Sequence, residues 1–210
     1  MTTRPIDVVQ RENARLHIEN RQLKEEVRNL RAFVNMLNDL HHAGERVTDD
    51  TQLLPLLRRI LRQAMKLLDA PDGSLLLLDE ETNELVFVVV YGIMEDQLIN
   101  YRIPADEGIA GWVIRNRRST LVPNVRVDMR FYHQIDEEFK FNTQSIAAAP
   151  LIGDRHVYGV IEALNRPGDK PFTEEDVALL ELLCRAAGEL LADIANNRNP
   201  MLAPEKANGH

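Results

Sequence analysis

The first forty residues carry an apolar pattern that repeats every seven residues. The d positions of the repeat are Val9, Leu16, Leu23, Leu30 and Leu37, and the a positions are Ile6, Asn13, Asn20, Val27 and Val34. Leucine at d with β-branched residues at a favours two strands, and asparagine at a fixes the register because it pairs with its twin. The pattern therefore predicts a two-stranded coiled coil from about Ile6 to Leu40, in which these residues form a dimer interface.

Charged residues beside this seam favour a parallel arrangement. Position g holds Glu12, Glu19 and Glu26, and position e holds His17, Lys24 and Arg31. In a parallel dimer each g residue faces the next e residue of the partner, whereas antiparallel helices would bring acids against acids. The alternative is an amphipathic helix folded back on its own domain, which normally has a wider apolar stripe without two asparagines in it. We expect the rod to occupy residues 1–44, since the repeat fails at His41 and Gly44.

The charge of the chain narrows the choice of partners. Its 210 residues carry a net charge of -8. An acidic chain gains nothing from a phosphate backbone, so we expect no direct nucleic-acid partner. The same charge argues against docking on anionic lipid, and the longest apolar run, Leu85–Met94, is about half of what a membrane span needs. We therefore expect no membrane association.

Cysteine usage indicates a reducing compartment. Cys184 is the only cysteine, so an intramolecular disulfide and a cysteine zinc site are both excluded. It stands in a predicted helix, where we expect a core residue rather than a thiol sensor. The segment Met1–Asp7 lacks the apolar core of a secretory signal. Together these features predict a cytoplasmic protein.

Residues 45–196 carry the periodicities of an α+β domain. Helical stripes cover Leu53–Leu68, with Pro55 expected in the first turn, and Thr173–Ile194. The predicted strands are Leu75–Leu78, Leu85–Tyr91, Arg102–Pro104, Leu121–Val122, Ser145–Ile152 and Val157–Leu164, and a short helix is predicted over Gly108–Arg117. An irregular stretch reaches Gln144. This order predicts one antiparallel sheet with helices on one side, followed by a polar, disordered tail at 197–210.

Five segments stand in an order and spacing typical of one known family. They are Gly108–Ile114, Val122–Phe131, Gln144–Leu151, Tyr158–Asn165 and Phe172–Asp176. Taken together over about Thr48–Ile194, they resemble the GAF domains, a family of cytoplasmic sensor domains. The resemblance implies a sheet of about six strands with the first and last helices packed behind it, which in the family often pair with a partner's copies. It also implies that the other face of the sheet holds a small ligand, such as a cyclic nucleotide, bilin, haem or amino acid.

The segment Asn124–Phe141 is the predicted roof of a ligand pocket, because long irregular stretches inside compact domains tend to be functional. The candidate ligand-binding residues are Trp112, Asn124, Asp128, Phe131, His133, Phe141, Ser145 and Ala147. Small residues at alternate positions of the strand that begins at Ser145 favour a cavity on one face. For Asp128 the alternative role is to tie the loop, and for Phe131 it is to anchor the roof. We expect Glu162 to face solvent.

The resemblance does not favour a cyclic nucleotide as the ligand. Val125 follows Asn124 where cyclic-nucleotide-binding members carry lysine, and Lys140 stands where many carry glycine. Bilin attachment needs a cysteine near the pocket, and the GAF methionine sulfoxide reductases use several, so the single Cys184 argues against both. No metal site is predicted and no cofactor is assigned.

Three functions remain open at this point. The favoured one is a dimeric regulatory protein that senses a small molecule and transmits the change through its helices to a separate output protein. The second is a GAF scaffold without a ligand, which serves dimerisation and protein docking. The third is an enzyme such as a methionine sulfoxide reductase, which the cysteine count disfavours. We expect no catalytic residue.

Overall fold

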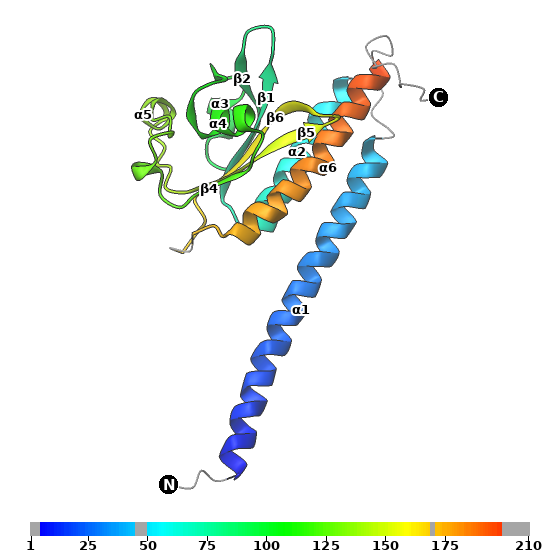
Figure 1. Ribbon diagram of the computed structural model, residues 1–210, viewed down its shortest axis with the longest axis vertical. Helices are drawn as coiled ribbons and strands as arrows, with labels where there is room; N and C mark the ends of the chain where they lie inside the picture. Colours follow the sequence, from blue (N-terminus) through cyan, green and yellow to red (C-terminus); the bar gives the residue numbers. More distant parts are fainter. Residues whose placement is uncertain (1–4, 45–49, 169–170, 199–210) are drawn as a thin grey trace, which may run out of the picture. The chain divides into compact units, whose positions relative to one another are not determined.

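The computed structural model describes residues 5–44, 50–168 and 171–198 (Figure 1). The chain divides into two units, residues 1–38 and residues 39–210. Helix α1 (Pro5–Gly44) is unbroken over 40 residues. Each α1 side chain that the structure describes is exposed, including the apolar Val9, Leu16, Leu23, Val27 and Val34. The described part of this apolar stripe is therefore exposed along α1.

A six-stranded antiparallel sheet forms the centre of the second unit, in the order β3-β2-β1-β6-β5-β4. The strands are β1 (Asp72–Asp79), β2 (Glu84–Tyr91), β3 (Arg102–Pro104), β4 (Thr120–Val122), β5 (Ile146–Gly153) and β6 (His156–Leu164). Two hairpins, β1–β2 and β5–β6, meet where β1 pairs with β6. The central strands are rich in β-branched and other apolar residues, which pack well on a pleated surface.

Two long helices cover one face of this sheet, α2 (Asp50–Leu68) and α6 (Glu174–Arg198), and Figure 1 shows them running side by side. Their apolar stripes are buried, as at Leu57 and Leu183. Helix α6 approaches β5 so closely that a Cβ on Gly188 would lie 2.3 Å from the carbonyl oxygen of Ile152. The glycine therefore permits a contact between helix and strand that alanine would prevent.

The opposite face carries the short helices α3 (Glu95–Leu98), α4 (Gly108–Asn116) and α5 (Gln134–Phe139), with the 3₁₀ turn η1 (Val125–Val127). A second cluster of buried apolar residues lies here, between α4 and the sheet. Leu76, Phe87 and Val160 from the sheet pack in it with Ile109 and Val113 from α4. Each strand thus divides its side chains between the α2–α6 side and the α4 side, as the two-residue period requires.

The sheet and flanking helices confirm the predicted α+β fold, and every predicted strand is present. Three details were wrong. Helices were expected on one side of the sheet, but the short helices α3, α4 and α5 cover the other face. The stretch expected to be irregular contains η1 and α5, because helices of three and six residues are too short to show a period. Pro55 lies in the second turn of α2 rather than the first, since α2 begins at Asp50. The residues of the predicted tail from 199 onward lie outside the described part of the chain.

Candidate functional site

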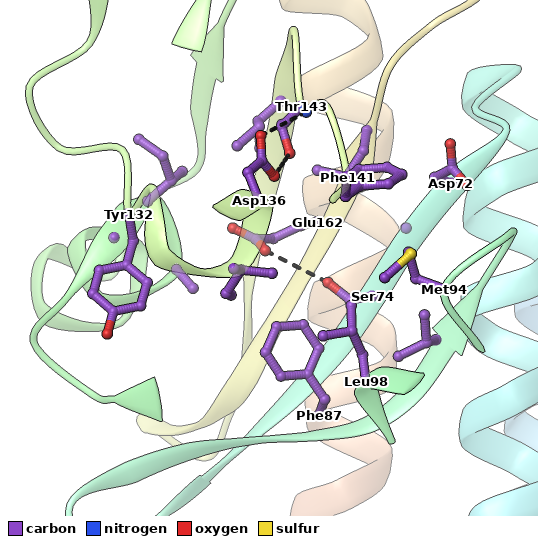
Figure 2. Close-up of a pocket in the computed structure, with 18 of the residues that line it drawn as sticks. Asp72, Ser74, Phe87, Met94, Leu98, Tyr132, Asp136, Phe141, Thr143 and Glu162 are labelled. Atoms are coloured by element: carbon purple, nitrogen blue, oxygen red, sulfur yellow. Dashed lines mark hydrogen bonds between the residues drawn. The ribbon is translucent and has the colours of Figure 1, made fainter. Parts of the chain in front are cut away.

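A cavity lies between the sheet and its cover of short helices (Figure 2). Its volume is about 70 Å³, which is room for about five to seven water molecules at about 10–15 Å³ each. Most of its wall is apolar and comes from β2, α3, α4 and α5. The polar side chains in the wall are Asp72, Ser74, Tyr91, Tyr132, Asp136, Thr143 and Glu162. The site is therefore an apolar hollow with a few polar groups, the usual composition of a small-molecule pocket.

Glu162 places a carboxylate inside this cavity. It stands on β6 between Val160 and Leu164, which face the α4 side, so the alternation of the strand points its side chain the same way. Its neighbours across the sheet are Ser74 and Ala148, two small residues that leave room beside it. The expectation that Glu162 faces solvent was wrong, because the α4 side of β6 is covered.

Burial changes the chemistry of this carboxylate. The hydroxyl of Ser74 donates to its Oε2 at 3.5 Å, a long hydrogen bond drawn as a dashed line in Figure 2. Desolvation disfavours the charged form, and this bond offsets little of that effect, so the pKa of Glu162 rises from 4.5 to about 7. Near neutral pH the cavity therefore contains a group that can hold or release a proton.

A second carboxylate, Asp136 on α5, holds the roof of the cavity. The backbone N–H of Thr143 donates to its Oδ2 at 2.8 Å and the Thr143 hydroxyl donates to its Oδ1 at 2.7 Å. The Tyr101 hydroxyl donates to Glu138, also on α5, at 2.7 Å, and this bond raises the pKa of Tyr101 to about 12. These contacts fix α5 over the cavity from two sides.

A third carboxylate, Asp72, closes the cavity at the start of β1. Its Oδ1 accepts from the backbone N–H of Ile93 at 3.2 Å. A Cβ on Gly92 would lie 2.2 Å from the same oxygen, and Gly92 has a positive φ of 103°. Only glycine lets the chain turn this tightly against the carboxylate. Asp72 therefore secures the turn that leads from β2 into α3.

Three of the predicted ligand-binding residues come together near the cavity. Phe131 and Phe141 line it, and both also line a shallower hollow beside it that includes His133. The imidazole of His133 packs edge-on against Phe131, with the ring centroids 4.8 Å apart. The two aromatic rings thus separate the cavity from the adjoining surface.

Trp112, Asn124 and Asp128 have contacts of their own outside the cavity wall. Arg130 Nη2 lies 2.6 Å from Asp128 Oδ2, and the guanidinium stacks on the Trp112 ring at 4.6 Å. This pairing lowers the pKa of Asp128. The Asn124 side chain accepts from the backbone N–H of Arg126 at 3.0 Å and caps η1. These residues tie the loop together, which is the alternative role considered for Asp128.

Ser145 and Ala147 are buried but do not line the cavity. The α4-side cluster takes Ile146 and Ala148 from this strand, so Ala147 faces the α2–α6 side. The backbone carbonyl of Ser145 accepts from the N–H of Asn165 at 3.1 Å. The small residues of β5 that favoured a cavity therefore lie one position out of phase with it.

Sequence reasoning missed the polar residues of the cavity, namely Asp72, Ser74, Asp136 and Glu162. For Glu162 a signal was present, because an acid between Val160 and Leu164 shares the apolar face of a strand. Asp72, Ser74 and Asp136 gave no comparable signal, since turns and short loops normally carry such residues.

The described residues contain neither a cluster of metal ligands nor a membrane-spanning helix. No group of three or more histidine, cysteine, aspartate or glutamate side chains there could hold a metal ion. Among the same residues, no helix combines the length and apolar content that crossing a bilayer requires. Cys184 is buried, and burial raises the pKa of its thiol. Its predicted place in the core is confirmed.

The fold and the residues of the second unit match a known family. The family model described as "GAF domain" matches residues 53–192. This chain belongs to the GAF domain family. The GAF domain of a phosphoenolpyruvate-protein phosphotransferase from Coxiella burnetii superposes with a TM-score of 0.65 at 18% identity, covering 80% of this chain and 96% of that one. GAF domains are generally regulatory or sensor domains, so the predicted family and regulatory class are confirmed.

Curated relatives include enzymes that are far longer than this GAF protein. The cone cGMP-specific 3',5'-cyclic phosphodiesterase subunit alpha' of Gallus gallus is 30% identical over 101 residues, which is 46% of this chain and 12% of that protein. The rod subunit alpha of Homo sapiens is 32% identical over 88 residues, covering 42% and 10%. The chain thus spans about a tenth of the length of these relatives.

Proposed function

We propose that this GAF protein is a regulatory sensor, in which a small molecule binds the cavity and alters the packing of α2 and α6. The observation that carries the proposal is the cavity itself, a mostly apolar hollow that contains the carboxylate of Glu162. A scaffold without a ligand would have no use for a half-buried acid whose desolvation destabilises the fold. In a binding site, the same carboxylate can form a hydrogen bond or an ion pair with a ligand.

Strand β6 connects the cavity to the long helices. Glu162 faces the cavity, while its neighbour Ile161 is fully buried outside the α4-side cluster, on the face that α2 and α6 cover. A ligand that moves Glu162 therefore moves Ile161 against these helices. The ligand changes the protein only if it binds one arrangement of α2 and α6 more tightly than another. Helix α1 precedes α2 in the chain and carries the change to a separate output protein.

A thermal-shift screen of metabolites and cyclic nucleotides tests this function. We expect at least one compound to raise the melting temperature, and mass spectrometry of the purified protein to identify related molecules. In Ile135→Trp, which fills the cavity from α5, the same compound should lose its effect, whereas Glu137→Trp on the exposed side of α5 should retain it. The absence of any stabilising or co-purified compound would contradict the sensor function.

The proposal includes a parallel dimer formed by α1. A helix of 40 residues with an exposed apolar stripe gains little stability from its own contacts. A second copy would cover the stripe, and it would bring Glu12 and Glu19 of one protomer opposite His17 and Lys24 of the other. An intrahelical ion pair from Arg15 to Glu12, at 2.6 Å, already holds one of these acids in place.

Two substitutions of similar exposure distinguish this dimer from a nonspecific contact. Leu23 lies at position d of the repeat and is 52% exposed, whereas Ile18 lies outside the seam, at position f, and is 59% exposed. In sedimentation analysis of the full chain, Leu23→Lys should lower the dimer fraction and Ile18→Lys should leave it unchanged. An equal loss in both variants would refute the heptad seam.

We assign no catalytic step to the protein. The single cysteine is buried in α6 and is absent from the cavity wall, which supports a non-enzymatic role over a thiol-dependent reduction. A cytoplasmic location fits a chain whose only thiol is unpaired. An assay for methionine sulfoxide reduction should give no activity above buffer, and a measured turnover would contradict this assignment.

A further inference from the structure

The three carboxylates of the cavity differ in the hydrogen bonds that they accept. Asp72 accepts from the backbone of the β2–α3 turn, and Asp136 accepts two hydrogen bonds from Thr143. Glu162 receives one bond of 3.5 Å from Ser74, at the far limit of hydrogen-bond length. Two carboxylates therefore hold the walls, and the third retains acceptor capacity directed into the cavity (Figure 2).

The charge of the wall has one sign. Among the described residues that line the cavity, none is lysine, arginine or histidine, while three are acids. Two arginines of the roof segment lie outside this wall. The guanidinium of Arg130 pairs with Asp128 and stacks on Trp112, and that of Arg126, in the adjoining hollow with His133, donates to Asn142 at 3.3 Å. A phosphate or carboxylate in the cavity would meet acids without a compensating cation, which costs free energy in a site of low dielectric.

The remaining wall suits an apolar body. Phe87, Met94, Leu98 and Phe141 surround the space beside Glu162, as Figure 2 shows. The volume of about 70 Å³ suits a ligand, or the part of one that enters the cavity, of about five to seven non-hydrogen atoms, by comparison with the same number of waters. The site thus offers a small, mostly apolar hollow with one carboxylate, that of Glu162, which accepts no backbone hydrogen bond in the structure.

We propose that the cavity binds a small organic cation, whose N–H groups donate to the carboxylate of Glu162 while its apolar body packs against Phe87 and Phe141. This assignment rests on the proposed sensor function and names the ligand class of that site. A protonated amine supplies what the arrangement lacks, a positive charge and hydrogen-bond donors. The ligand would also relieve the desolvation of the buried acid.

The titration of Glu162 supports this assignment. The groups that face it are Asp72 and Ser74 from β1, Tyr91 from β2, Tyr132 before α5, and Asp136 from α5. Burial raises the pKa of Glu162 to about 7, so a cation that requires the carboxylate form should bind about tenfold more tightly at pH 8 than at pH 6. A neutral ligand should lack this gain.

Methionine methyl groups report binding in the full-length protein. Met94 lines the cavity, whereas Met129 is 101% exposed and serves as the control for nonspecific contact. We suggest titrating ¹³C-methyl-methionine protein with n-butylamine, 1-butanol and butyrate, which have similar size and differ in charge. The Met94 signal should shift with n-butylamine at a concentration about tenfold lower than with 1-butanol, the effect of one charge-assisted hydrogen bond. Butyrate should shift it least.

Variants then assign the selectivity to one side chain. Glu162→Gln should bring the affinity for n-butylamine down to that for 1-butanol and remove its pH dependence. Glu81→Gln, in the exposed β1–β2 turn, should behave as wild type. The comparison of the three probes on the wild-type protein requires no variant, so it decides the question even if Glu162→Gln does not fold.

Three results would overturn the cation assignment. They are a shift of Met94 by butyrate equal to that by n-butylamine, no shift of Met94 by any probe, and unchanged n-butylamine binding in Glu162→Gln. If the cation assignment fails but the metabolite screen yields a stabilising compound, only the proposed ligand class is wrong and the sensor function is retained. If the screen yields no such compound, the sensor function is rejected independently of the ligand class.

Discussion

Replacing Glu162 by glutamine should stabilise the protein at high pH and leave it unchanged at low pH. The folded state holds the Glu162 proton more tightly than the unfolded chain does, because burial raises its pKa from 4.5 to about 7. Stability from this group is therefore fully present below pH 4.5 and is lost as the pH rises through 7. Glutamine keeps the shape of the protonated acid and does not titrate.

The magnitude follows from the two pKa values. At about 1.4 kcal/mol for each tenfold change in proton affinity, the difference between 4.5 and about 7 amounts to about 3 kcal/mol. The side chain has some access to the cavity, and water there reduces the effect, so we expect Glu162→Gln to raise the free energy of unfolding by about 1 to 3 kcal/mol at pH 8. At pH 4.5 the two proteins should agree within about 0.5 kcal/mol.

Urea unfolding at fixed protein concentration, followed by circular dichroism at pH 4.5, 6, 7 and 8, measures this difference. The test compares the free energies of unfolding of wild type and Glu162→Gln at each pH. Asp79, Glu84 and Asp128 have lowered pKa values, so both proteins lose the same stability from these groups as the pH falls, and this loss cancels in the difference. Glu81→Gln serves as the control and should follow wild type at every pH. A constant difference between wild type and Glu162→Gln across this range would refute the burial argument.

Three further predictions concern the roof, the helix layer and the thiol. Asp136→Ala removes the two carboxylate oxygens that accept hydrogen bonds from Thr143, so it should lower the free energy of unfolding by about 1 to 3 kcal/mol. Hydrogen exchange at the Thr143 amide should also become faster, and unchanged exchange would contradict the role of Asp136. Gly188→Ala places a Cβ 2.3 Å from the Ile152 carbonyl oxygen and should destabilise by about 2 kcal/mol or more in urea unfolding, whereas a neutral result would show that α6 shifts freely. Cys184 should resist a thiol reagent in buffer and react once the protein is unfolded, because it is fully buried; rapid labelling of the folded protein would contradict that burial.

The elements with strong periodicity could be predicted, and the short ones could not. Leu85–Tyr91 and Val157–Leu164 are strands because their residues suit a pleated surface, and the structure contains both. Helix α5, with six residues, has too few turns to show a period. The roof therefore looked irregular, although hydrogen bonds from Thr143 and Tyr101 hold this helix in place.

The candidate site shows the same division. Phe131 and Phe141 reach the cavity because the segment that carries them does cover the sheet. Trp112 and Asp128 pair with Arg130 instead, a choice that depends on the path of a loop rather than on any pattern. Ala147 faces the helices because register decides which half of a strand points to the cavity, and a shift of one residue reverses the choice.

The coiled-coil pattern of α1, the family and the succession of strands along the chain follow from the sequence by itself, because residue spacing along one element determines which side chains share a face. What only the tertiary structure decided is the chemistry of the cavity. Asp72, Ser74, Asp136 and Glu162 come from distant parts of the chain, and their environment exists only once the sheet is covered. The raised pKa of Glu162 is a property of that enclosure, since desolvation depends on what surrounds a group and not on its neighbours in sequence.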